Sequence, residues 1–212
     1  MPRWTLIRVS GIACIIGGAS LVAFMLIHPW DQLMGAAIAR TPRWQLAHTF
    51  HFVGALFAVA GLIGMYLYRR ERLGLAGLIG FALSFAGTAM FAGTGMITAF
   101  IWPMLAMDAP STVDVGGAIF AAPRSAFAFG LTAVTTSVGY VVFGGAMLRT
   151  NAYPRLAIVA LVVGAVIGML PPHPVGPVPW AISVFGGVLY GVALISFGVI
   201  LTRAGSAKVA AT

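Results

Sequence analysis

Length, composition and charge indicate an integral membrane protein. Of the 212 residues, 60% are hydrophobic and 8% are charged, which is far outside the range of a soluble domain. The formal net charge of +8 would suggest an acidic partner for a soluble protein, but in a membrane protein the position of each charge matters more than the sum. The chain has no interleaved basic and aromatic pattern, which argues against nucleic-acid binding.

Six apolar segments approach or exceed the length of about 20 residues that a membrane span needs. We therefore predict an all-α fold in which residues 1–212 form a single transmembrane domain, an up-down bundle of six helices. The predicted spans are residues 9–28, 46–68, 74–102, 125–148, 155–170 and 180–202. The remaining loops and tail are too short for a soluble domain, which takes about 50 residues or more.

The first segment, 9–28, is predicted to be an uncleaved span, because it exceeds the core of about 7 to 15 residues that a signal peptide has. The single cysteine of the chain, Cys14, lies in it, so an intramolecular disulfide is excluded. The segment ends at His28, and Asp31 follows in the next connection.

The second segment, 46–68, carries two histidines near its beginning. His48 and His51 are three residues apart, so both side chains project from one face of the helix. Such a pair can present two imidazoles to a common ligand, and neutral imidazole is the commonest metal ligand in proteins and a usual axial ligand of haem.

The third segment, 74–102, is longer than a span requires. At about 1.5 Å per residue it reaches about 43 Å, against a hydrocarbon core of about 30 Å. We expect a bend or a close helix contact in the run Gly87 to Gly95, which contains Gly93-Thr94-Gly95. The helix is expected to end at Trp102-Pro103.

Small residues four positions apart predict helix contacts in the third, fifth and sixth segments, since helices in lipid approach one another through such faces. The fifth and sixth segments are also joined by a proline-rich connection that contains His173.

The small-residue faces are in addition candidates for contact with a second copy or with another subunit of a membrane complex. The residues concerned are Gly80, Ser84, Gly164, Gly168, Gly187 and Gly191.

The basic residues predict the orientation. With six spans, nine of the twelve lie on one side, and Arg40, Arg43 and Arg124 lie on the other. The positive-inside rule then places both termini in the cytoplasm. Arginine far outnumbers lysine, and alanine and glycine are abundant, as in a high-GC bacterium, so we expect an inner-membrane protein. Glycines that recur at the start of odd segments and the end of even ones suggest three tandem helical hairpins.

Several stretches together carry a resemblance to a known group. These are Trp44 to His48, Gly54 to Tyr68, Arg72 to Gly77, and the exit Phe100 to Pro103. In the placement of glycine, tryptophan and histidine, the chain resembles the uncharacterised six-helix inner-membrane proteins common in high-GC bacteria. The resemblance implies the topology described above and no activity.

All four histidines fall at the predicted non-cytoplasmic end, and they are the residues of this sequence that most directly indicate a binding site. A cofactor site would use His48, His51, His28 and His173, and a metal site His48, His51, His28 and Asp31. A haem or a transition metal is one hypothesis for this end. Simple interfacial histidines with no cofactor are the favoured alternative, since amphipathic rings are common at membrane interfaces.

Three functions remain open. The sharpest is a membrane module that binds a small ligand, a metal or haem at a histidine-lined site. The absence of charge inside the spans favours a passive carrier or channel for a small neutral or apolar solute, and the small-residue faces favour a non-catalytic accessory subunit. We predict no catalytic residues, because carboxylates or a nucleophile with its base at membrane depth are missing, and a non-enzyme is favoured.

Overall fold

The chain is helical throughout most of the part that the structure describes. The computed structural model describes residues 3–30, 35–114, 116–151, 153–170 and 179–209, and no strand occurs among them. In chain order the helices are α1 (Arg3–Ile27), α2 (Ala36–Ala39), α3 (Pro42–Met96), the π-helix η1 (Ile97–Ile101), α4 (Trp102–Asp108), the 3-10 turn η2 (Pro110–Thr112), α5 (Ala118–Ala121), α6 (Pro123–Leu148), α7 (Arg155–Gly168) and α8 (Trp180–Val209). The predicted all-α class is confirmed.

Several helices are long and apolar enough to cross a membrane. Within the described residues these are α1, α3 with its continuation to Asp108, α6 and α8. α7 is shorter: its 14 residues rise about 21 Å, less than a hydrocarbon core of about 30 Å. The helices therefore do not correspond one for one to the six predicted spans.

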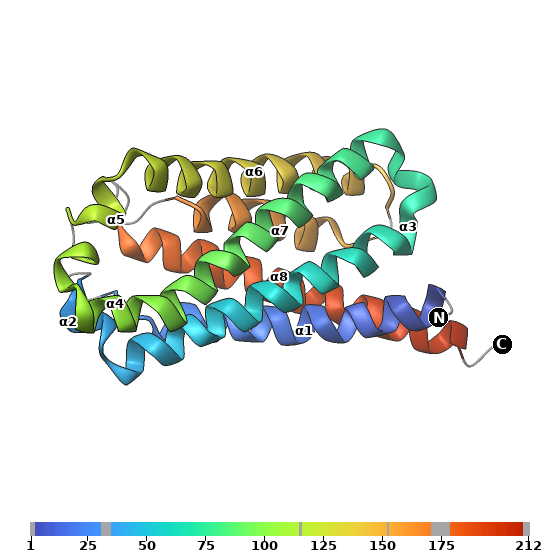
Figure 1. The fold of residues 1–212 in the computed structure, drawn as a ribbon. Coiled ribbons are helices and arrows are strands. Elements are labelled where there is room, and N and C mark those ends of the chain that lie inside the picture. Colours follow the sequence, from blue (N-terminus) through green and yellow to red (C-terminus); the bar gives the residue numbers. More distant parts are fainter. Residues whose placement is uncertain (1–2, 31–34, 115, 152, 171–178, 210–212) are drawn as a thin grey trace.

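α3 consists of two arms. Its backbone departs from helical values at Arg69 (φ −137°, ψ 26°) and Gly74 (φ 60°, ψ −165°), and the ribbon turns back there (Figure 1). Glycine adopts the positive φ of Gly74 without steric cost. We call residues 42–68 the first arm of α3 and residues 75–96 the second arm.

The chain ends and the turn between the arms lie at one end of the molecule (Figure 1). There Arg3 Nη1 lies 2.6 Å from Glu71 Oε1, which joins the start of α1 to this turn. Since both side chains are partly exposed, this ion pair contributes little stability. The opposite end carries α2, α4 and α5, so the loops that the charge pattern separated into two groups lie at two ends.

α1 packs against α8 and α3, and glycines allow the close approach. A Cβ added at Gly18 would lie 2.3 Å from the carbonyl oxygen of Gly191 in α8. One added at Gly61 would lie 2.4 Å from Sγ of Cys14. Cys14 is fully buried and acts in this contact as a small apolar side chain.

The predicted small-residue faces pack within the chain. A Cβ at Gly80 would lie 2.4 Å from the backbone nitrogen of Phe143 in α6, and one at Gly164 would lie 2.4 Å from that of Tyr190 in α8. The remaining members also contact helices of the same chain, and the full set is Gly80, Ser84, Gly164, Gly168, Gly187 and Gly191. The structure thus shows these faces in contacts between helices of the same chain.

The second arm does not bend where the sequence suggested. Its backbone stays helical from Gly87 to Met96, and the irregularity lies in the π-helix η1 that follows. The helix then continues as α4 to Asp108, so the predicted end at Trp102-Pro103 is wrong. Pro103 lies in the first turn of α4, directly after the π-helix.

The glycines of this stretch have different surroundings. A Cβ at Gly87 would lie 2.5 Å from Oγ1 of Thr136 in α6, and one at Gly95 would lie 2.8 Å from the backbone nitrogen of Phe52. A Cβ at Gly93 would meet no atom within 4 Å. The predicted bend or contact at Gly93 is therefore wrong, because this glycine faces open space and its neighbours make the contacts.

Candidate functional site

The first turns of α3 place a tryptophan and two histidines on one face. Thr41 caps the helix by accepting a hydrogen bond from the N–H of Trp44 (3.2 Å), and Pro42 occupies the first turn, a combination that favours helix initiation. His48 follows Trp44 by four residues and His51 follows by three more, so their side chains lie above one another. All three rings are buried.

His28 joins them from the end of α1. Arg43 Nε donates a hydrogen bond to the carbonyl of Ile27 (2.7 Å), which holds the end of α1 beside the beginning of α3. The ring centroids of His28 and His48 are 5.0 Å apart, and those of His48 and His51 are 5.9 Å apart. Three of the histidines singled out in the sequence therefore lie next to one another.

The tautomer of His48 follows from the hydrogen bonds of Thr98 in η1. Thr98 Oγ1 lies 2.9 Å from His48 Nδ1, and also 2.9 Å and 3.1 Å from the carbonyl oxygens of Thr94 and Gly95. Carbonyl oxygens only accept, so the hydroxyl proton goes to one of them and His48 Nδ1 donates to Thr98. His48 Nε2 is then left with a free lone pair.

The π-helix is held by a second bond to the same residue. Trp44 Nε1 donates to the carbonyl oxygen of Thr98 (2.9 Å), so Thr98 is bonded through both backbone and side chain to the first arm of α3. In a π-helix the hydrogen-bond pattern is displaced by one residue, and such turns are often found at functional sites. Here the turn aims a hydroxyl at an imidazole.

Four imidazole nitrogens are buried without a hydrogen-bond partner in the described part of the chain. They are Nδ1 of His28, Nε2 of His48, and both ring nitrogens of His51, whose ring also interacts with the backbone of Phe91. The ring of His51 lies between Phe24 (centroid distance 4.8 Å) and Phe91 (4.0 Å). Phenylalanine rings therefore flank the His51 imidazole, which in its neutral form has one nitrogen that donates and one that accepts a hydrogen bond.

A cavity of about 270 Å³ lies beside these rings, and we call it the histidine pocket. Its walls combine the three imidazoles with aromatic rings and threonine hydroxyls. No charged residue is present among its described lining. The lining residues are Phe24, His28, Trp30, His48, His51, Phe91, Thr94, Thr98, Trp102, Phe120, Phe129, Thr132, Ala133, Gly168, Met169 and Leu170.

The short helices next to the histidine pocket are fixed by polar contacts. Arg40 Nε donates to the carbonyl oxygen of Ala106 in α4 (2.8 Å), and Asp114 Oδ1 accepts from the N–H of Ala36 in α2 (2.8 Å). The indole rings of Trp44 and Trp102 stack with centroids 5.5 Å apart. These contacts hold α2 and α4 together, and Trp102 of α4 lines the histidine pocket.

The described residues do not by themselves form a metal site. Within this part of the chain, no three or more His, Cys, Asp or Glu side chains are arranged to hold an ion. Asp31 of the predicted metal set and His173 of the predicted cofactor set lie outside the described residues. A haem ligated by two histidines has one imidazole on each face of its plane, whereas His48 and His51 share one helix face.

Sequence reasoning did not identify Trp44 and Thr98 as parts of this site. The spacing of Trp44 and His48, four residues apart on one helix face, was a signal for the first. No sequence signal pointed to Thr98, because its role depends on the π-helix and on the packing of the two arms of α3.

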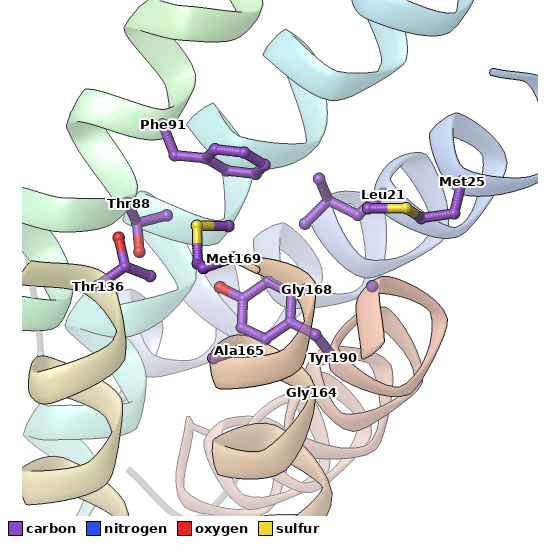
Figure 2. A pocket seen from close by; sticks show the side chains of 11 residues that line it. Leu21, Met25, Thr88, Phe91, Thr136, Gly164, Ala165, Gly168, Met169 and Tyr190 are labelled. Carbon is purple, nitrogen blue, oxygen red and sulfur yellow. The ribbon is translucent and has the colours of Figure 1, made fainter. Parts of the chain in front are cut away.

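A second polar site lies deeper in the molecule. Tyr140 hydroxyl is 3.1 Å from Thr88 Oγ1 and in close contact with the hydroxyl of Tyr190. A cavity of about 20 Å³ is lined by Thr88 and Tyr190 among others and has room for one water molecule. Figure 2 shows the side chains of Thr88, Thr136, Phe91 and Tyr190 around it. Phe91 lines both this small cavity and the histidine pocket.

Comparison with protein-family models, with curated proteins and with solved structures finds no match to this chain.

Proposed function

We propose that the protein is a six-span inner-membrane protein that binds a small neutral ligand in the histidine pocket. The six spans are α1, the two arms of α3, α6, α7 and α8. The reversal at Arg69 to Gly74 supports counting α3 twice, since about 55 residues of straight helix would rise about 82 Å, far more than a bilayer core.

The charge pattern supports the orientation. The loops at residues 69–74 and 149–155 and both chain termini hold nine of the twelve basic residues, so the positive-inside rule assigns them to the cytoplasm. The histidine pocket then lies at the opposite, non-cytoplasmic end, within the lipid bilayer. The arginine-rich, lysine-poor composition is the basis for assigning a bacterial inner membrane.

One observation carries the proposed function: the unpartnered nitrogens of His28, His48 and His51 beside a single cavity. Buried polar atoms in native proteins are nearly always hydrogen-bonded, and an unpaired one costs about 1 to 3 kcal/mol. Packing three histidines around a cavity is therefore unfavourable for stability alone. A ligand that bonds these nitrogens offsets the cost.

The ligand is expected to be uncharged and partly aromatic. Among the described residues, no Lys, Arg, Asp or Glu lines the histidine pocket, so this part of its wall offers no counter-ion to an ionic ligand. Burying an unpaired charge is strongly unfavourable. Aromatic walls instead favour a flat apolar body with a few polar atoms.

The test is to identify what the protein carries when purified from its own membrane in mild detergent. We expect native mass spectrometry and organic extraction to reveal a small neutral molecule that is absent from His51→Phe, a substitution of similar size that removes both unpartnered nitrogens. Visible absorption and metal analysis of the same sample test for haem and metal. Equal small-molecule content in the wild type and His51→Phe would contradict the proposed function.

A further inference from the structure

A second and larger cavity adjoins the histidine pocket. Its volume is about 520 Å³, and it lies between the second arm of α3, η1 and α6. It shares part of its wall with the histidine pocket, and the shared residues are Thr94, Thr98, Trp102, Phe129 and Thr132. We call this second cavity the lateral groove; the two cavities form neighbouring compartments behind a common wall of hydroxyls and rings.

The lateral groove is bordered by large apolar side chains that face outward. Ile97 is 46% exposed, Phe127 70% and Leu131 44%, exposures that place these side chains against hydrocarbon chains in a bilayer. Gly93 lines the same groove and has no atom near the position of a Cβ. The groove therefore opens towards the lipid, and the glycine keeps it wide.

The two cavities differ in chemistry. The histidine pocket is lined by three imidazole rings and by aromatic faces, whereas the described walls of the groove are apolar apart from the hydroxyls of Thr94, Thr98, Ser125 and Thr132 and the indole of Trp102. No charged residue lines either cavity in the described part of the chain. A phosphate-headed lipid would therefore lack a cationic partner, and the arrangement suits a neutral molecule with a polar ring and an apolar tail.

We propose that the ligand of the histidine pocket is a quinone with an alkyl or prenyl tail, whose ring lies among the histidines and whose tail lies in the lateral groove. This inference rests on the proposed function. A cavity of about 150 Å³ accommodates a benzene ring, so about 270 Å³ has room for a substituted one. The carbonyl oxygens of the ring accept hydrogen bonds from imidazole N–H groups.

The same site suits the reduced form of the ring. Each neutral imidazole carries one donor and one acceptor nitrogen, and the buried ring of His51 lies in the wall of the pocket. Hydroxyls of a hydroquinone can donate to His48 Nε2, whose lone pair is free because Nδ1 bonds Thr98. The pocket is thus equipped to bind both forms, with the ring stacked on Phe24, Trp30 or Phe91.

The test compares two probes that differ only in the tail: a fully substituted benzoquinone with a decyl chain, and the same ring with methyl in its place. Binding is followed in one detergent by quenching of tryptophan fluorescence, since Trp30 and Trp102 line the histidine pocket. We expect His51→Phe to lose both probes. Gly93→Leu should weaken the decyl compound about tenfold through overfilling of the groove and leave the methyl compound unchanged.

Gly145→Leu is the matched control. Gly145 is also a helical glycine with no atom within 4 Å of an added Cβ, and it lines neither cavity. The Gly145→Leu protein should bind both probes as the wild type does. The ratio of decyl to methyl affinity within each variant removes the effect of partitioning into detergent.

Each other outcome separates the two proposals. If Gly93→Leu weakens neither probe while His51→Phe loses both, the tail is not in the groove and the histidine pocket still binds the ring. If neither probe binds the wild type, but a co-purified small molecule is lost in His51→Phe, the quinone class is wrong and the proposed function holds. If His51→Phe changes neither the probes nor the co-purified molecules, both proposals fail.

Discussion

The imidazole of His48 and the hydroxyl of Thr98 are 50 residues apart in the chain and 2.9 Å apart in space. The first belongs to the first arm of α3, and the second to the π-helix that follows the second arm. Their hydrogen bond fixes the tautomer of His48 and directs the free lone pair of Nε2. An element that looks like a local irregularity therefore sets the chemistry of a side chain on another helix.

Replacing Thr98 by valine should destabilise the protein. Valine keeps the shape and leaves His48 Nδ1 buried without its acceptor, so we expect a loss of about 1 to 3 kcal/mol in the free energy of unfolding. Denaturant unfolding in detergent measures the loss, and nitrogen-15 NMR of the histidines reports the tautomer. Thr98→Ser keeps the hydroxyl and should retain the wild-type tautomer; a Thr98→Val protein with the wild-type tautomer would contradict the assignment.

Replacing Gly87 or Gly93 of the second arm by leucine should have different effects on the stability of the protein. Gly87→Leu places a side chain against the backbone of Thr136 and should cost about 1 to 3 kcal/mol or more. Gly93→Leu projects into the lateral groove and should leave stability nearly unchanged. Thermal unfolding of both variants in the same detergent measures their stability. Equal losses of stability in the two variants would show that Gly93 is packed.

The buried hydroxyls of Tyr140 and Tyr190 should be energetically coupled. Each single change to phenylalanine removes the contact between the two hydroxyls, although Tyr140 keeps Thr88 as a partner when Tyr190 is changed. Each change should cost about 1 to 2 kcal/mol. The double variant removes both and should cost less than the sum of the single changes. A double-mutant cycle by unfolding in detergent measures the coupling, and strict additivity would indicate that the two hydroxyls do not interact.

The orientation can be checked by cysteine labelling in intact cells. An impermeant maleimide should label Ala37→Cys in the exposed part of α2 and fail to label Arg70→Cys in the turn between the arms of α3. Native Cys14 is fully buried and should not react in the folded protein. Labelling of Arg70→Cys alone would reverse the orientation and put the histidine pocket on the cytoplasmic side.

Much of the architecture was predictable because a lipid environment permits few solutions. A spanning segment must satisfy its own backbone hydrogen bonds, so apolar segments of this length imply helices. Position along such a helix also sets depth, which is why His28, His48 and His51 could be predicted at one end. The three-residue spacing of His48 and His51 was enough to place them on one face.

The rest depended on how the helices rotate and pack. Gly87 and Gly93 look alike in the sequence, yet one contacts α6 and the other faces an open groove, because a helix turns by about 100° per residue. Likewise the π-helix and the role of Thr98 arise from contacts between two arms that are distant in the chain. Hydropathy and charge carry information about depth and side of the membrane, whereas the facing of each side chain, and hence the cavity, comes from packing between helices.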